Sequence, residues 1–196
     1  MSIWRQPCQA KWCYRLWTMA TLAPFDHGSP ERRLCDAHGQ AFITSYLANR
    51  PANLDAGENE GDYALCSVAL LSFDRKKGLQ NVYLWQARGF LAIDIGYCEA
   101  AILYHQLKGT FLSLSRPPTH VTMASLLGVL STSLSDVRIE RFDEEGRFYN
   151  ASLRLRQAEK PKVLDVRPSD AISLALCAQK PIRVAKSLLH PLPSGE

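Results

Sequence analysis

Apolar and polar residues follow two different periods along this chain, and the change between them marks the elements that we expect. Short stretches alternate or are continuously apolar, as in strands, and three longer ones repeat at helical spacing. The pattern predicts strands over 67–73, 82–85, 90–95, 137–142, 148–155, 163–167 and 180–184, and helices over 97–107, 123–134 and 169–179. This order of strands and helices is neither a regular βαβ alternation nor all-β. It predicts an α+β domain with a mixed or antiparallel sheet and helices packed on it.

The helix predicted over 123–134 has the clearest periodicity in the chain. Its large apolar residues, Met123, Leu126, Leu127, Leu130 and Leu134, recur at i, i+3, i+4, i+7 and i+11, and the helix that follows residue 169 has a similar apolar face. The spacing predicts one shared core made of Met123, Leu126, Leu127, Leu130, Leu134, Ile172, Ala175 and Leu176.

The stretch 163–176 predicts a strand that runs directly into a capped helix. Pro168 has no N–H and ends the strand, Ser169 is a favourable N-cap, and Asp170 complements the positive end of the helix dipole. Arg167, Ser169 and Asp170 are thereby gathered at one helix N-terminus, where an anion or a metal can bind. The same residues also suit a purely structural cap with an Arg–Asp ion pair.

The stretch 164–176, read as L-D-V-R-P-S-D-A-I-S-L-A-L, resembles the C-terminal signature of the bifunctional nuclease (BFN) domain family. The order of the further matching blocks also agrees with that family. They are L-A-I-D-I-G-Y-C-E-A at 91–100, R-P-P-T-H at 116–120, G-R-F-Y at 146–149 and K-P-I-R-V at 180–184. The resemblance covers residues 64–190.

The chain departs from the family pattern at several positions. Ala92 replaces a proline, Ala101 replaces an acidic residue of the first helix, and Val121 stands where the family has Asp after His120. Around Asn150 the alternation is one residue out of phase, which predicts a bulge or a shifted strand.

The resemblance implies a nuclease that acts on RNA and DNA with little sequence preference, by phosphodiester hydrolysis with a divalent metal, Mg or Mn. It also implies a nucleic-acid partner and a homodimer. Transferred onto matching positions, the catalytic candidates are Glu99, His120 and Asp170, the phosphate-binding candidates Arg116, Arg167 and Ser169, and the metal-ligand candidates Glu99, Asp165 and Asp170. The alternative is a non-catalytic regulatory or anion-binding module on the same fold, which the departures at Ala101 and Val121 favour.

Each candidate also has a structural interpretation. Glu99 suits the first turn of a helix, where it complements the dipole. His120 suits a role in the turn that begins the next helix, and Arg116 suits a surface ion pair.

Composition and charge place few limits on function. The net charge is +4, and all of the excess lies in residues 61–196, with seventeen Lys and Arg against thirteen Asp and Glu. This balance is compatible with a polyanionic partner but does not require one. The six cysteines lack metal-binding spacing, and an intracellular, reducing compartment is the simpler interpretation.

Residues 1–60 form a variable N-terminal segment and linker before a single BFN-like domain at 61–190 and a tail at 191–196. Residues 1–25 are basic and free of acids, which suits organelle targeting as well as an untargeted, partly disordered extension. The apolar stretch 16–25 is too short to span a membrane.

Overall fold

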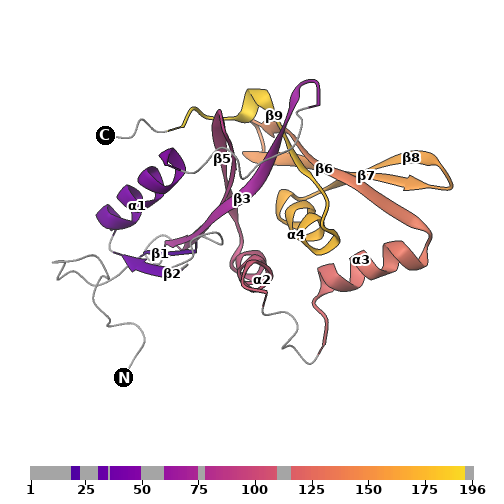
Figure 1. Cartoon of the computed structure of the whole chain (residues 1–196), viewed down its shortest axis with the longest axis horizontal. Coiled ribbons are helices and arrows are strands. Elements are labelled where there is room, and N and C mark those ends of the chain that lie inside the picture. Colours follow the sequence, from indigo (N-terminus) through magenta and orange to yellow (C-terminus); the bar gives the residue numbers. More distant parts are fainter. Residues whose placement is uncertain are drawn as a thin grey trace. The chain divides into compact units, whose positions relative to one another are not determined.

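The computed structural model describes residues 19–22, 31–34, 36–49, 60–74, 78–109 and 116–192 (Figure 1). The predictions for residues 1–18 and most of the linker at 50–61 lie outside these ranges. Two compact units divide the chain. The first contains Val68–Ala100 with both chain ends, Met1–Leu54 and His190–Glu196, and the second contains Asp55–Ser67 and Ala101–Leu189. Strand β3 (Tyr63–Asp74) and helix α2 (Tyr97–Leu107) each contribute residues to both units.

The first unit holds an antiparallel ladder. Strand β1 pairs antiparallel with β2 and with the end of β3, and β4 pairs with β3 and antiparallel with β5. The elements are β1 (Met19–Leu22), β2 (Glu31–Leu34), α1 (Asp36–Ala48), β3 (Tyr63–Asp74), β4 (Leu79–Gln86) and β5 (Gly89–Ile95).

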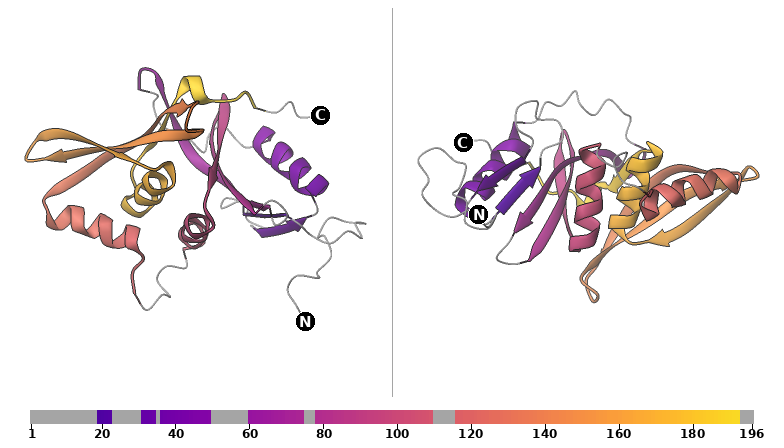
Figure 2. Two further views of the ribbon diagram at one scale, coloured as in Figure 1. Left: turned by 180° about the vertical axis from the view of Figure 1, so that it is seen from behind. Right: turned by 90° about the horizontal axis from the view of Figure 1, so that it is seen from below.

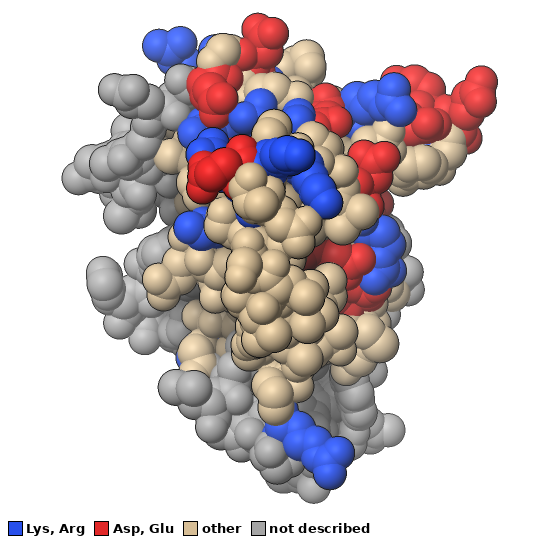
Figure 3. Space-filling model, turned by 90° about the vertical axis from the view of Figure 1, so that its right-hand side faces the viewer, with Lys and Arg blue, Asp and Glu red and all other residues tan. Residues whose placement is uncertain are grey.

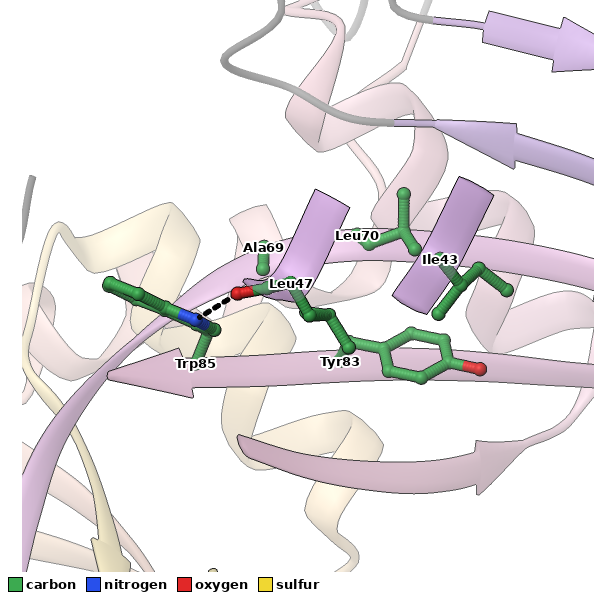
Figure 4. Close-up of a cluster of buried hydrophobic side chains, with 6 residues drawn as sticks. All are labelled: Ile43, Leu47, Ala69, Leu70, Tyr83 and Trp85. Atoms are coloured by element: carbon green, nitrogen blue, oxygen red, sulfur yellow. Dashed lines mark hydrogen bonds between the residues drawn. The ribbon is translucent and has the colours of Figure 1, made fainter. Parts of the chain in front are cut away.

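Helix α1 is anchored to this ladder by apolar packing and one buried hydrogen bond (Figure 4). Ile43 and Leu47 of α1 pack against residues of β3 and β4. The indole Nε1 of Trp85 donates a 3.1 Å hydrogen bond to the carbonyl oxygen of Leu47. The cluster consists of Ile43, Leu47, Ala69, Leu70, Tyr83 and Trp85.

The second unit contains a mixed sheet in the order β3-β9-β6-β7-β8. Strands β6 and β9 are parallel, whereas the pairs β3·β9, β6·β7 and β7·β8 are antiparallel. Helices α3 and α4 lie on one face of the β6-β7-β8 part of this sheet (Figures 1 and 2). The elements are α2 (Tyr97–Leu107), α3 (Thr119–Val129), β6 (Thr132–Asp143), β7 (Phe148–Gln157), β8 (Lys160–Val166), α4 (Pro168–Ala178), β9 (Ile182–Ala185) and the short 3₁₀ helix η4 (Lys186–Leu188).

These observations confirm the predicted α+β class and the mixed sheet. The predicted irregularity near Asn150 is also confirmed, because the β6·β7 register shifts between Ile139 and Arg141, which pair with Ala151 and Asn150. The extra residue lies on β6, so Glu140 has no direct partner on β7.

The predicted core was wrong for most of α3. The helix ends at Val129, and Leu134 instead lies buried in β6. Met123, Leu126 and Leu130 are exposed, and His120 is the buried residue of α3. The part of the prediction that lies on α4 holds for Ile172 and Ala175, which are fully buried. Helical spacing identified an apolar stripe correctly, but spacing alone does not say what covers the stripe.

The predicted N-cap at Ser169 was also wrong. Helix α4 begins one residue earlier, with Pro168 at its first position and Arg167 as the N-cap in an extended conformation. This agrees with the preference of proline for the first helical position. Ser169 is therefore inside the first turn, where its side chain is buried.

Candidate functional site

The site is an ion-pair cluster where α3 and α4 begin. The carboxylate of Asp170, in the first turn of α4, accepts two hydrogen bonds from Arg167, at 2.8 Å from Nε to Oδ2 and 3.1 Å from Nη2 to Oδ1. His120, in the first turn of α3, places Nε2 3.1 Å from the same Oδ1. The structure therefore brings together three of the predicted site residues, from two helices.

The backbone explains why Arg167 reaches Asp170. Arg167 is the last extended residue before α4, and Asp170 follows three positions later in the first helical turn. Residues at this spacing lie on the same side of a helix start, and the planar guanidinium matches a carboxylate with two parallel hydrogen bonds. The predicted Arg–Asp pair is confirmed.

The electrostatics favour an ionised Asp170. Partial burial by itself would raise the pKa of this carboxyl group, but hydrogen bonds from Arg167 and His120 and the charges of both side chains outweigh it. The pKa of Asp170 therefore lies below its ordinary value. At neutral pH the site presents a fixed carboxylate held between two nitrogen groups.

The three side chains differ in their access to solvent. The Arg167 side chain is 66% exposed and that of Asp170 27%, whereas that of His120 is only 8% exposed. The second ring nitrogen of His120, Nδ1, is buried and has no hydrogen-bond partner among the described residues. Arg167 and Asp170 are thus accessible to a ligand, whereas the His120 ring is largely buried and contacts Asp170.

Glu99 is a further predicted site residue. It lies in the first turn of α2, in the first unit, and its carboxylate folds back over Gly96, where a Cβ atom would collide with it. This placement matches the structural interpretation, in which an acidic side chain complements a helix N-terminus. A catalytic or metal-binding role for Glu99 stays a prediction.

Asp165 lies on β8 with its side chain exposed, and it lines a different hollow. This hollow has a volume of about 370 Å³ and is lined also by Glu140, Asp143 and Asn150. Arg116, just before α3, is exposed. The phosphate-binding roles of Arg116 and of the buried Ser169 stay predictions.

The described part of the chain shows no preformed site for a divalent metal. Among the described residues there is no group of three or more His, Cys, Asp or Glu side chains placed to hold a metal ion. Both carboxylate oxygens of Asp170 already accept hydrogen bonds from Arg167 or His120. Oxygen-rich coordination is what Mg²⁺ and Mn²⁺ require.

Sequence reasoning missed a second charged network in the same unit. Arg138 on β6 donates to Asp136, at 2.8 Å, and to Glu60, while Arg183 on β9 pairs with the same Glu60. Burial alone would lower the pKa of Arg138, but the carboxylates of Asp136 and Glu60 outweigh this effect. The pKa of Arg138 therefore lies above its ordinary value. The alternation of charge along 136–140 was the available signal. The partner strand β9 and Glu60 could not be inferred from it.

A comparison with protein families now places the chain. The family model of the bifunctional nuclease domain matches residues 83–192, which is more than half of the chain and includes the whole ion-pair cluster. The chain belongs to the bifunctional nuclease domain family. The resemblance stated on the sequence blocks is thereby confirmed.

Two relatives of this bifunctional nuclease domain protein are uncharacterized proteins of Mycobacterium tuberculosis, one from strain CDC 1551 / Oshkosh and one from strain ATCC 25618 / H37Rv. Each is 34% identical over 100 residues, which is 51% of this chain and 57% of the relative. The chain therefore spans little more than half the length of the curated relatives it matches.

No helix in the described part of the chain combines the length and the apolar character needed to cross a membrane.

Proposed function

We propose that the protein is a nuclease that hydrolyses phosphodiester bonds of RNA and DNA with little sequence preference, and that the scissile phosphate meets Arg167 and Asp170 at the start of α4. The observation that carries this proposal is the exposed guanidinium of Arg167, fixed by Asp170 inside the region that matches the family model. The family assignment supports the reaction class, and the geometry of the cluster supports this location for the site.

We assign Arg167, Asp170 and His120 different roles because their side chains differ in exposure to solvent. The guanidinium of Arg167 is planar and exposed, so it can bind phosphate oxygens and offset charge that develops during cleavage. Asp170 keeps that guanidinium oriented. His120 holds Asp170 from its other side and is a positioning residue, because its ring is buried.

Purified protein is incubated with labelled single- and double-stranded RNA and DNA, in buffer with Mg²⁺ or Mn²⁺ and in EDTA. We expect cleavage of both nucleic acids by the wild type and its loss in Asp170→Asn, which keeps the size of the side chain. Glu145→Gln, an exposed change in the β6–β7 turn, is the matched control and should cleave normally. Absence of cleavage under all conditions would overturn the nuclease proposal, whereas full activity of Asp170→Asn would overturn only its site.

The dependence on Mg²⁺ or Mn²⁺ is part of the same proposal and rests on the family resemblance alone. Glu99, Asp165 and Asp170 are the ligands to be tested. Inhibition by EDTA that Mg²⁺ or Mn²⁺ reverses would support the metal, and undiminished cleavage in EDTA would overturn it.

One observation favours the alternative of a non-catalytic anion-binding module. Arg167 is held at a helix N-terminus beside an ionised carboxylate, and a fixed cation at such a place can bind phosphate without cleaving anything. Binding of labelled oligonucleotides without cleavage, lost in Arg167→Ala, would select this function.

The proposed assembly is a homodimer, as the family resemblance implies. Strand β8 ends the sheet of the second unit and its residues 160–165 are exposed, so the edge is open in the described part of the chain. Light scattering that returns twice the chain mass of 22.0 kDa would support the dimer.

A further inference from the structure

The turn between β6 and β7 contains a sequence block that the ion-pair cluster does not use. The block G-R-F-Y, at 146–149, spans the end of this turn and the start of β7. Phe148 is 53% exposed although its side chain is large and aromatic. Its ring lies so close to Gly146 that a Cβ atom there would collide with it. The glycine therefore leaves room for an exposed aromatic ring in this position.

The Phe148 ring lines the same hollow as Asp165. We call it the β6–β8 hollow, and its volume of about 370 Å³ falls within the usual range for small-molecule sites, about 300–1,000 Å³. Phe148, Asn150 and Ser152 alternate along β7, and Ser152 pairs with Asp165 on β8, so these four side chains lie on one face of the sheet. The lining consists of Glu140, Arg141, Asp143, Phe148, Asn150, Ala151, Asp165 and Val166.

The β6–β8 hollow borders the proposed phosphate site. Val166 lines the hollow, and Arg167 follows it directly in the chain, with a distance of about 3.8 Å between their Cα atoms. Arg167 is the last extended residue before α4, and its side chain is 66% exposed. A nucleotide whose phosphate is bound by Arg167 therefore has the hollow within reach of its base.

The lining of the hollow suits hydrogen-bond donors and disfavours phosphate. The carboxylates of Glu140, Asp143 and Asp165 outnumber the single guanidinium of Arg141. Arg141 is also engaged, because the Asn150 amide oxygen, when turned toward it, accepts hydrogen bonds of 2.7 and 3.2 Å from Nε and Nη2. Asp165 is exposed, so its carboxylate is open to a ligand. Carboxylates repel a phosphate group but accept hydrogen bonds from an uncharged amino group.

We propose that the β6–β8 hollow binds one nucleobase of the RNA or DNA strand whose phosphate meets Arg167. Phe148 stacks on the base, and Asp165 accepts a hydrogen bond from an exocyclic amino group of that base. A base inside a duplex is stacked and paired, so the strand that enters the hollow is single-stranded. The inference rests on the nuclease proposed above and names the part of the substrate that the site recognises.

The carboxylates of the hollow select among the bases. Cytosine, adenine and guanine each carry an exocyclic amino group that can donate to a carboxylate. In uracil a carbonyl oxygen replaces the amino group of cytosine, and next to Asp165 it would place two acceptors against each other. The hollow therefore favours cytosine over uracil, two bases of nearly equal size. This preference concerns one base, while the phosphate contacts of the same strand carry no sequence information.

Figure 3 shows why a contact to a base matters for this protein. On the face in view, basic and acidic side chains are intermixed, and the described Lys and Arg residues form no broad area of their own there. Affinity that comes from the phosphate backbone grows with the number of phosphates that Lys and Arg neutralise. Where such contacts are few, a base stacked on Phe148 supplies a larger share of the binding.

The test measures binding of labelled oligo(rC) and oligo(rU) to the full chain by fluorescence anisotropy in EDTA. The wild type should bind oligo(rC) more tightly than oligo(rU). Phe148→Ala should weaken binding of oligo(rC) about 5- to 150-fold, the range for one base stacked on an aromatic ring, and Phe148→Tyr should retain it. Val163→Ala is the matched control, because it trims an exposed apolar side chain of β8 outside the hollow and should bind like the wild type.

Asp165→Asn tests the base preference separately from stacking. The amide offers a donor as well as an acceptor, so the variant should bind oligo(rC) and oligo(rU) with nearly equal affinity. Because EDTA removes free divalent metal, the metal role proposed for Asp165 does not enter this measurement. Phe148 and Asp165 are exposed, so their replacement should leave the protein folded, and thermal unfolding verifies this.

The outcomes separate the base site from the nuclease activity. Equal affinity of the wild type for the two oligonucleotides, or unchanged binding by Phe148→Ala, overturns the base site and leaves the nuclease proposal in place. An undiminished preference in Asp165→Asn overturns the role of this carboxylate. Preferential binding of oligo(rC) that is lost in Phe148→Ala supports the base site, even where Mg²⁺ or Mn²⁺ brings about no cleavage and the nuclease proposal fails.

Discussion

His120 Nε2 and Asp170 Oδ1 lie 3.1 Å apart although fifty residues separate them in the chain. This contact joins the first turns of α3 and α4, and on α3 it comes from His120, the buried residue of that helix. A buried polar side chain needs a partner, so the His120–Asp170 pair helps to hold α3 against α4. The same carboxylate fixes Arg167, and one residue thus serves both packing and the proposed site.

Replacing Asp170 with Asn tests these two roles separately. The amide keeps the shape but loses the charge that Arg167 and His120 contact, so we expect the unfolding free energy to fall by about 1–3 kcal/mol, as for hydrogen bonds to charged groups. Chemical denaturation measures this loss. A stability equal to that of the wild type would show that the ion pairs contribute nothing measurable, as is common for exposed pairs.

The depressed pKa of Asp170 makes part of the stability depend on acid. Its pKa is lower in the folded protein than in the unfolded chain, so its contribution is complete above the ordinary carboxyl pKa. The contribution is lost as the pH falls from about 4 through the lower pKa of the folded state. We expect the difference in unfolding free energy between wild type and Asp170→Asn to shrink over this range. Denaturation curves at several pH values measure it, and a constant difference would contradict the assignment.

Much of the cluster could be predicted from the sequence, because two of its three residues are close together in the chain. Arg167 and Asp170 are three residues apart at a strand-to-helix junction, and that spacing alone predicts their contact. The position of His120 beside them was a matter of resemblance, since no local rule connects residues on two different helices. Glu99 shows the opposite case, because its fit to a first helical turn explains its placement without any site.

The error on α3 has a physical cause. Met123, Leu126 and Leu130 have the spacing of a core-facing stripe, and the same spacing suits a stripe that faces a partner molecule. The sequence could not distinguish the two cases. The chain turns into β6 at Thr132, with Ser131 in the left-handed region at φ 51°, and thereby moves Leu134 from the predicted helix into the sheet.

The corrected core predicts where truncation is costly. Ile172 is fully buried on α4, so Ile172→Ala should lower the unfolding free energy by about 2–5 kcal/mol through lost burial and a cavity. Val163→Ala, at a residue 52% exposed on β8, should change it by less than about 0.5 kcal/mol. Urea denaturation of both variants measures the contrast. Similar costs at the two positions would mean that α4 does not cover the sheet as described.

Among the described residues, three cysteines should differ in reactivity with alkylating reagents. Cys98 is exposed, Cys177 is half-buried and Cys66 is buried. Burial raises the pKa of the Cys177 thiol despite its hydrogen bond with Gln106, and this lowers the fraction of reactive thiolate. Brief treatment with iodoacetamide followed by peptide mass spectrometry should show the order Cys98, then Cys177, then Cys66. Earlier modification of Cys66 would contradict its burial.

The hydrogen bond between Trp85 and Leu47 tests how α1 is attached to the strands of the first unit. Trp85→Phe keeps a large aromatic ring in the cluster but removes the indole N–H, which leaves the Leu47 carbonyl buried without its 3.1 Å donor. An unsatisfied buried acceptor costs about 1–3 kcal/mol, so the unfolding free energy should fall by about that amount. Hydrogen exchange should also become faster at the end of α1, because local opening no longer breaks this bond. Ile43→Val is the control, since it trims the same cluster by one methylene group and leaves the hydrogen bond in place. If both variants accelerate exchange at the end of α1 equally, packing alone attaches the helix and the indole hydrogen bond does not.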